Sequence, residues 1–395
     1  MKTIKDIPLT GKKVLIRVDF NVPLDQDRNV TDDTRVKGSL PTIDYALKQG
    51  CKVILASHLG RPDGKPDKKY SLAPAARCLE THLGRPVKLA PDCIGPEAVA
   101  MADRMNAGDV ILLENLRFHP GEEKNADDFA EQLASLCDVY VNDAFAVSHR
   151  DNASVSAITR FAPRSVAGFL LDKEIDYFNQ AMTHPQRPLA VVLGGAKVSG
   201  KLAAIENILL RVDKIIIGGA MANTFLAAGG FAMGKSKIEA DLIGTAGDIM
   251  TKAADRGVRF YLPVDVVAAD RFAEDARLKT VPVGEMPEDW MALDIGPASV
   301  LLFKEAIADA RTIVWNGPMG AFEMPPFSQG TLAMVDALAE SNALTIVGGG
   351  DTDVAVHMTD KAEKITYIST GGGAFLELLE GKKLPGVVAL EQTEK

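Results

Sequence analysis

The 395-residue sequence has few cysteines and no long apolar run. Its four cysteines, Cys51, Cys78, Cys93 and Cys137, form no CxxC pair, so the spacing indicates neither a disulfide framework nor a zinc site and fits a reducing cytoplasm. No apolar run approaches the ~18 residues that a membrane span needs. The first residues lack the apolar stretch of a signal peptide, so we expect no export.

An excess of positive charge is also missing. The chain carries 44 Lys and Arg against 53 Asp and Glu, a net charge of −9, which makes it a poor candidate for binding nucleic acid. Such a chain can still bind a small anion where its cations are concentrated. The content of 47% hydrophobic and 25% charged residues is typical of a globular protein, and the length favours two or three domains at ~150 residues each.

Short β-branched runs alternate with longer amphipathic stretches along the whole chain. This alternation predicts an α/β fold class with two Rossmann-like domains, whose parallel sheets are covered by helices on both faces. A helix over 170–182, inside a seam at 168–188, is expected to join them as a semi-rigid hinge. Strands are predicted at 14–18, 52–56, 110–114, 139–142, 189–193, 214–217, 259–262, 312–315, 344–347 and 364–368. Other helices are predicted to begin at Ser39 (with Pro41 in the first turn) and at Ser71, and over 127–137, 201–211 (capped by Ser199) and 241–256.

Arginine and histidine follow the predicted strands of the first half. In open α/β sheets, ligands bind beyond the carboxyl ends of the strands. We expect the loop residue Arg35 to share that edge with His58, Arg61, Arg117, His119, His149 and Arg150. Guanidinium groups suit carboxylate and phosphate oxygens, so the pattern indicates a site for a small polyanion. The alternative is that these arginines are solvated, and that Asp19 and Asn21 only form a turn.

Glycine takes this place in the second half. Glycine-rich turns follow the predicted strands at 194–197, 218–220, 316–320, 348–352 and 371–374. Such turns let backbone N–H groups approach phosphate oxygens, and a following helix N-terminus attracts anions, so several on one sheet edge favour a nucleotide site. A single Gly-Gly turn more often reflects tight packing.

Residues 195–202 nearly match the P-loop pattern GxxxxGK[ST]. Leu202 stands where the pattern needs a magnesium-binding Ser or Thr, so we do not assign a P-loop. Asp351, a hard oxygen ligand beside a triple glycine, is the candidate for Mg²⁺. Lys201 either faces a phosphate or is an exposed helix lysine. Its expected place in a first helical turn, where the dipole disfavours cations, favours a nearby anion.

Eight motifs together resemble phosphoglycerate kinase, in order and over nearly the whole chain. They are RVDFNVP (17–23), SHLGRP (57–62), LLENLRFHPGEE (112–123), NDAF (142–145), LGGAKVSGK (193–201), WNGPMGAFE (315–323), GGGDT (348–352) and STGGGAFLELLEGK (369–382). The resemblance implies a 3-phosphoglycerate-binding domain at 1–169, an interdomain helix and hinge at 170–188, a nucleotide-binding domain at 189–380 and a tail at 381–395 that returns to the first domain. The chain departs from the family pattern at Gly200 and Ala146, whose side chains are not expected to contact ligand.

The resemblance also implies roles for single residues. Substrate binding falls to Asp19, Asn21, Arg35, His58, Leu59, Gly60, Arg61, Arg117 and Arg150. Nucleotide binding falls to Gly194, Gly195, Lys197, Lys201, Gly219, Asn316, Glu323, Gly348, Gly349, Gly350, Asp351 and Thr352, with Asp351 toward Mg²⁺ and Glu323 toward the ribose. The transferring phosphoryl group is neutralised by Arg35, Lys201, Gly350 and Gly373. His119 and His149 are treated as structural.

The implied reaction is the reversible transfer of the acyl phosphate of 1,3-bisphosphoglycerate to ADP, by a cytoplasmic monomer. Both nucleophiles are ionised at neutral pH, so alignment, charge neutralisation and domain closure suffice without a general base. Two other classes of protein fit the sequence less well. A Rossmann dehydrogenase needs GxGxxG after its first strand, where DFNVP stands instead. A two-lobed solute-binding protein needs export and no magnesium-nucleotide site.

Overall fold

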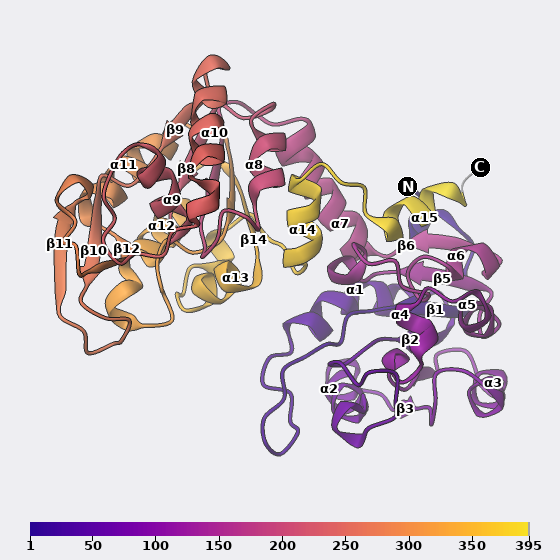
Figure 1. Cartoon of the computed structure of the whole chain (residues 1–395). Coiled ribbons are helices and arrows are strands. Elements are labelled where there is room, and N and C mark those ends of the chain that lie inside the picture. Colours follow the sequence, from indigo (N-terminus) through magenta and orange to yellow (C-terminus); the bar gives the residue numbers. More distant parts are fainter. Residues whose placement is uncertain (394–395) are drawn as a thin grey trace. The chain divides into compact units, whose positions relative to one another are not determined.

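The computed structural model describes residues 1–393. The chain folds into two compact units. Unit 1 contains Met1–Asp176 together with the chain from Lys383 on, and unit 2 contains Tyr177–Lys382 (Figure 1). Each unit has a six-stranded, all-parallel sheet with helices around it, which confirms the predicted α/β class. In the described residues, no helix combines the length and the apolar character that a membrane span requires.

The sheet of unit 1 has the strand order β3-β4-β2-β1-β5-β6. Its strands are β1 (Lys13–Arg17), β2 (Lys52–Ala56), β3 (Val87–Leu89), β4 (Val110–Leu112), β5 (Val139–Asn142) and β6 (Ser165–Ala167). Its helices are α1 (Thr34–Lys48), α2 (Ala73–Leu83), α3 (Pro96–Asp103), α4 (Pro120–Glu123), α5 (Asp127–Ala134), α6 (Ile158–Phe161) and α15 (Pro385–Gln392), and α7 (Phe169–Phe178) begins in this unit and ends in the first residues of unit 2. The chain runs from β1 to β2 on one side of β1 and later adds β5 on the other. In sheets with such a reversal, ligands bind beyond the carboxyl ends of the central strands.

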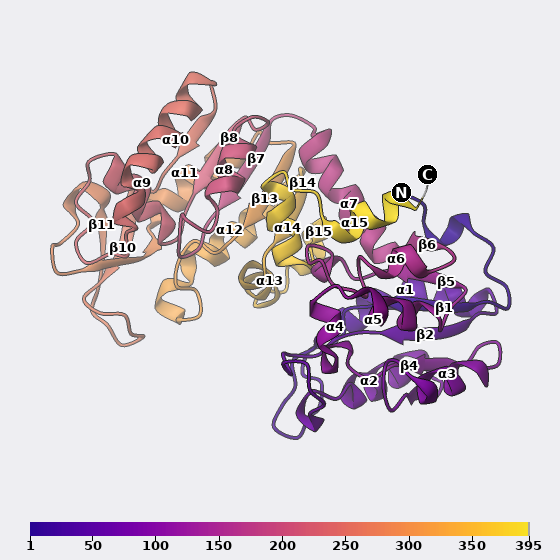
Figure 2. The same ribbon diagram turned by 45° about the vertical axis from the view of Figure 1, so that its right-hand side comes forward.

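Helix α15 lies beside β6, although some 200 residues separate them in the sequence (Figure 2). The backbone N–H of Gly386 donates to the carbonyl oxygen of Ser148 at 3.0 Å. A Cβ on Gly386 would approach Val155 and Asn142 closely, so only glycine lets this helix lie so near the loop after β5.

The parallel sheet of unit 2 has the strand order β15-β14-β13-β7-β8-β9. Its strands are β7 (Leu189–Leu193), β8 (Lys214–Ile217), β9 (Arg259–Tyr261), β13 (Thr312–Asn316), β14 (Leu344–Gly348) and β15 (Tyr367–Ile368). Its helices are α8 (Leu202–Ile208), α9 (Met221–Ala228), α10 (Ile243–Asp255), α11 (Pro297–Ile307), α12 (Gln329–Ala339), α13 (Gly350–His357) and α14 (Gly372–Leu379). The strand order reverses at β7, between β8 and β13, so the topology rule places the ligand-binding edge of this unit at the carboxyl ends of β7 and β13.

Unit 2 also has a three-stranded antiparallel sheet that the sequence did not predict. Strand β10 (Asp265–Ala269) pairs with β11 (Leu278–Pro282) and with β12 (Met291–Ile295). Strand β11 is mostly exposed, so it lacks the buried apolar run by which the other strands were recognised. The short strands β3 and β6 were also not predicted.

Two predicted helix starts are wrong. Helix α1 begins at Thr34, five residues before Ser39, so Arg35 lies in its first turn rather than in a loop, and Pro41 lies inside the helix. The true start signal is the Asp32–Thr34 segment, where the Asp32 carboxylate accepts from the N–H of Thr34 at 2.9 Å. Ser199 caps no helix: α8 begins at Leu202, and the Ser199 hydroxyl donates to Glu239.

Candidate functional site

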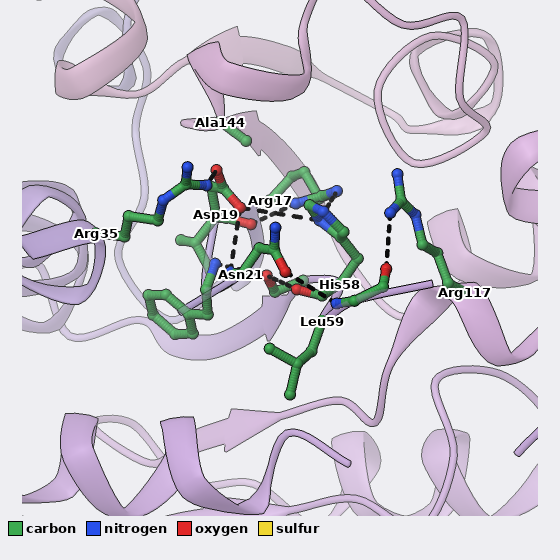
Figure 3. A network of polar contacts seen from close by, with 12 residues as sticks. Arg17, Asp19, Asn21, Arg35, His58, Leu59, Arg117 and Ala144 are labelled. Carbon is green, nitrogen blue, oxygen red and sulfur yellow. Dashed lines mark hydrogen bonds and ion pairs between the residues drawn. The ribbon is translucent and has the colours of Figure 1, made fainter. Parts of the chain in front are cut away.

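In unit 1, polar side chains follow β1, β2 and β4 at one edge of the sheet. Asp19 lies at their centre and is almost fully buried (Figure 3). Its carboxylate pairs with the guanidinium of Arg35 through one oxygen and accepts from the N–H of Asn21 at 3.2 Å through the other. The Asn21 side-chain oxygen accepts from the N–H of Gly60 at 2.9 Å. These contacts hold together three segments that the sequence analysis had assigned to one site.

His58 is fully buried among cations. Burial lowers its pKa well below 6.5, and the charges of Arg17, Arg117, Arg150 and Arg35 lower the pKa further. The imidazole is therefore neutral at pH 7. Its Nδ1 lies 3.3 Å from the Arg17 guanidinium, which can only donate, so the ring proton belongs on Nε2. His58 is thus set as a hydrogen-bond donor for an anion and not as a second cation.

The loops after β2 and β4 are joined by Asn115 and Arg117. The Asn115 amide nitrogen donates to the carbonyl oxygens of Leu59 at 2.7 Å and Tyr70 at 2.8 Å, and its oxygen accepts from the N–H of Arg117 at 3.0 Å. The Arg117 guanidinium donates to the Gly60 carbonyl at 2.8 Å. Burial lowers the Arg117 pKa, but an arginine titrates so high that it stays charged at neutral pH.

Arg17 is a site residue that sequence reasoning missed. It is the last residue of β1 and is 2% exposed; its Nε donates to the Ser154 hydroxyl at 2.9 Å. Ser154 in turn donates to the buried carboxylate of Glu122 at 2.7 Å. The available signal was an arginine inside an apolar strand, since a buried cation needs partners. Ser154 and Glu122 lie far from Arg17 in the sequence and carried no such signal.

In the described part of the chain, two residues that were predicted for this site have no hydrogen bond or ion pair with the network around Asp19. Arg61 is exposed, and within residues 1–393 its side chain has no hydrogen bond or ion pair with another predicted residue. Arg150 is half-buried, and only its electrostatic effect on His58 and Arg117 links it to the network. The structure therefore brings Asp19, Asn21, Arg35, His58, Leu59, Gly60 and Arg117 into one network, with Arg150 nearby.

In unit 2, Lys201 and Asn316 connect two strand ends. The Lys201 Nζ donates to both the backbone oxygen and the side-chain oxygen of Asn316, each at 2.6 Å. The Asn316 amide nitrogen donates to the carbonyl of Gly348 at the end of β14 at 2.9 Å. Burial lowers the pKa of Lys201 to about 7, against the opposing charge of Asp351. The ammonium group therefore lacks sufficient negative charge around it, as expected of a group that receives an anionic ligand.

The glycine turns after β7, β8 and β13 pack directly on one another. The N–H of Gly195 donates to the Pro318 carbonyl at 2.9 Å, and the N–H of Gly219 donates to the Met319 carbonyl at 2.9 Å. A Cβ on Gly194 would collide with the carbonyl oxygens of Gly317 and Pro318. Close packing therefore accounts for Gly194 and Gly219 without any ligand, which is the alternative explanation that the sequence left open.

Two helix N-termini lie together beside Lys201. Helix α13 starts after Gly349, whose φ is +102°, and α14 starts at Gly372, where a Cβ would approach Gly349 and the N–H of Gly350 at 3.1 Å. Gly373 lies in the first turn of α14. Amide groups in the first turn of a helix have no intrahelical acceptor and attract anions.

Other predicted nucleotide residues lie around this point. Asp351 is exposed in the first turn of α13, while the buried Thr352 hydroxyl accepts from the N–H of Gly317 at 2.7 Å. Lys197 is exposed, and its charge helps to lower the pKa of Glu239. Glu323 is exposed in the loop between β13 and α12, and within residues 1–393 its side chain has no hydrogen bond or ion pair with the glycine turns.

The fold and these groups define a class of protein. Two parallel α/β units, one with buried arginines around a neutral histidine and one with glycine turns, a lysine and two helix N-termini, are typical of enzymes that act on phosphorylated small molecules. The phosphoglycerate kinase family model matches residues 4–382. The chain belongs to this family.

Individual relatives agree with the family match. The chain is 62% identical over 387 residues to the phosphoglycerate kinase of Geobacter metallireducens, with 98% of this chain and 97% of the relative covered. It is 57% identical to that of Desulfosudis oleivorans over the full length of both. The solved phosphoglycerate kinase structure from Coxiella burnetii has a TM-score of 0.91 and 41% identity, and that from Pyrococcus horikoshii has a TM-score of 0.87 and 32% identity. Each covers 100% of this chain and 99% of the other. The predicted resemblance is confirmed, and the chain is a phosphotransferase of glycolysis.

Proposed function

We propose that the chain catalyses 1,3-bisphosphoglycerate + ADP ⇌ 3-phosphoglycerate + ATP, with the phosphoglycerate on unit 1 and the nucleotide on unit 2. The observation that carries the assignment of ligands is the different chemistry of the residue groups at the strand ends of the two units. Unit 1 concentrates arginine side chains around His58, and unit 2 presents Lys201 with two helix N-termini.

Arg35, Arg117 and Arg150 hold the anionic groups of the phosphoglycerate in this proposal. His58 donates from Nε2, and Asp19 keeps Arg35 in place while Asn21 positions the Gly60 loop. Both nucleophiles, a carboxylate and a nucleotide phosphate, are ionised at neutral pH, so no residue has to remove a proton. Catalysis then depends on alignment and on neutralising the phosphoryl oxygens with Arg35, Lys201, Gly350 and Gly373.

The two ligands must share one phosphorus atom during transfer, so we propose that the units close around them and expel water. Small-angle scattering should show a larger fall in radius of gyration with both ligands than the sum of the separate changes. An unchanged radius under turnover would contradict closure.

A coupled assay tests the reaction. Turnover should require both 3-phosphoglycerate and ATP in the reverse direction, and it should not occur with NAD in place of ATP. An absence of turnover with saturating substrates and folded protein would contradict the assignment.

We further propose that the chain is a cytoplasmic monomer, in agreement with four free cysteines in the described residues and a glycolytic role. Light scattering at assay concentration should give the mass of one chain. The mass of a dimer would contradict the monomer.

The nucleotide is proposed to bind as its Mg²⁺ complex, with Asp351 as the protein ligand. The donor set fits: Asp351 offers an exposed carboxylate, and Mg²⁺ commonly takes one or two carboxylates together with phosphate oxygens and waters. Thr352 is a poorer ligand, because its side chain is fully buried and its hydroxyl already accepts from the N–H of Gly317. When bound, the ion neutralises phosphate charge.

Asp351→Asn should weaken Mg-nucleotide binding at least ~10-fold and leave 3-phosphoglycerate binding unchanged, because only the metal ligand is removed. Calorimetry with each ligand alone checks this. Asp353→Asn is the matched control, because Asp353 lies in the same turn of α13 and pairs with His357 at 2.9 Å. Equal losses of both ligands in Asp351→Asn would indicate a folding defect instead.

Nucleotide binding should take up a proton above pH 7. The Lys201 pKa of about 7 in the free protein will rise when a phosphate approaches, so affinity should fall as pH rises through that value, by up to about tenfold per pH unit. Calorimetry at pH 8 in buffers of different ionisation enthalpy measures the uptake. Lys201→Arg stays charged at all these pH values, so it should lose the uptake. Persistent uptake in that variant would assign the proton to another group.

A further inference from the structure

Three potential metal ligands from two helices meet on the surface of unit 1, outside the network around Asp19. Asp33 is the N-cap residue of α1, and Cys78 and His82 lie one turn apart on α2. Residues four apart on a helix share one face. One ligand atom of each residue lies within 4.8 Å of those of the other two.

The side chain of Asp33 contacts Lys37 on α1 and His82 on α2. It makes no capping hydrogen bond. One carboxylate oxygen pairs with Lys37 Nζ at 2.9 Å, and the other lies 2.8 Å from His82 Nε2. The second oxygen, the imidazole nitrogen and the Cys78 sulfur therefore converge. In a tetrahedral zinc site, such donors stand about 3.2–3.7 Å apart, so small side-chain rotations would complete the geometry.

A surface cavity of about 320 Å³ is lined by Asp33, Cys78 and His82. It gives an ion access and leaves room for water as a fourth ligand. The cavity wall also includes Arg28 and Arg77, and the Arg28 guanidinium donates to the carbonyl oxygens of Lys68 and Ser71. Lys37 is also close by, so the positive charges around the cavity disfavour weak binding of a cation. A sulfur, nitrogen and oxygen set favours Zn²⁺ over Mg²⁺ or Ca²⁺, which prefer oxygen alone.

One other cluster of this kind occurs within residues 1–393. It contains Asp92, Cys93 and His119, with His119 Nε2 at 2.7 Å from the Asp92 carboxylate. Cys93 is completely buried, whereas Cys78 is partly exposed. An ion from solvent can therefore reach the Cys78 sulfur without opening the core, and Cys93 provides a matched control.

We propose that Asp33, Cys78 and His82 form a Zn²⁺ site that joins the start of α1 to α2. Cys78 binds as a thiolate, and its proton goes to the solvent. An ion held by both helices binds the folded unit more tightly than the unfolded chain, so it stabilises the fold.

Titration of the full-length, nucleotide-free protein with Zn²⁺ tests the site, with Co²⁺ as an absorbing probe. We expect Cys78→Ser to weaken Zn²⁺ binding at least ~10-fold and to abolish the thiolate-to-cobalt absorption band, while Cys93→Ser changes neither. Zn²⁺ should raise the Tm of the natural chain and not that of Cys78→Ser. His82→Asn should reproduce the loss, so the result does not rest on one variant.

Metal-free Tm and turnover with Mg-ATP report whether the variants fold, and both should match the natural chain. Unchanged Zn²⁺ affinity and cobalt absorption in Cys78→Ser would overturn the proposal. So would their loss in Cys93→Ser alone, which would place the ion at His119.

Discussion

Replacing Arg35 with alanine should lower kcat by at least ~100-fold, because a charge that contacts the transferring phosphoryl group contributes roughly 2.7–4 kcal/mol to transition-state stabilisation. Arg35 lies in the first turn of α1, and its guanidinium is paired with the nearly buried Asp19. This pairing orients the side chain before substrate binds. Steady-state kinetics with 3-phosphoglycerate and ATP measure the effect.

Two further variants separate catalysis from folding. Arg160→Ala removes an exposed pair with Asp127 in the same unit and should leave kcat unchanged. Arg35→Lys keeps the positive charge but loses the bidentate hydrogen bonding of the guanidinium group, so its kcat should lie between those of the natural chain and Arg35→Ala. Turnover of Arg35→Ala within about threefold of the natural chain would remove Arg35 from the catalytic group.

Gly194→Ala should destabilise unit 2 by about 3 kcal/mol and lower its Tm by about 6–12 °C. The new Cβ would collide with the backbone carbonyl oxygens of Gly317 and Pro318, and backbone atoms cannot rotate away as a side chain can. The same shift would disturb Asn316, which holds Lys201, so nucleotide affinity should fall as well. Thermal unfolding and nucleotide calorimetry check the two effects.

Gly200→Ala is the matched control in the same loop. Nothing lies within 4 Å of a Cβ at Gly200, and its φ is not positive, so this change should be neutral or stabilise by up to about 1 kcal/mol. A Tm of Gly194→Ala equal to that of Gly200→Ala would show that the turns after β7 and β13 can separate without loss.

Much of the fold could be predicted from local patterns. The strands β2, β5, β7 and β8 have the predicted bounds, because a buried parallel strand is a short apolar run limited by turn residues. The start of α1 was predicted too late, because Ser39 and Pro41 match the pattern of a helix start although they lie inside the helix. Tertiary packing stabilises the helix across these two residues. Strand β11 was missed because it is mostly exposed and carries little apolar signal, whereas β10 and β12 are mostly buried and their short apolar runs were overlooked.

The candidate site was predictable in its residue types and less so in its connections. The topology rule for parallel sheets places residues after successive strands at one edge, which is why Asp19, His58 and Arg117 lie together. The rule does not say which of them touch. Arg61 follows β2 as His58 does, yet its side chain is exposed. Arg17 was predicted only as part of a strand, and the sequence does not show that its guanidinium lies 3.3 Å from the His58 ring.

The sequence by itself determined the α/β class, the family and the residue types that follow the strands of each unit, because periodicity and contiguous motifs are local properties of the chain. Only the tertiary structure decided the protonation of His58, the lowered pKa of Lys201 and the meeting of Asp33 with Cys78 and His82. The cysteine spacing had indicated no zinc site. Each of these features depends on burial or on distances between residues far apart in the chain, and local patterns do not encode either quantity.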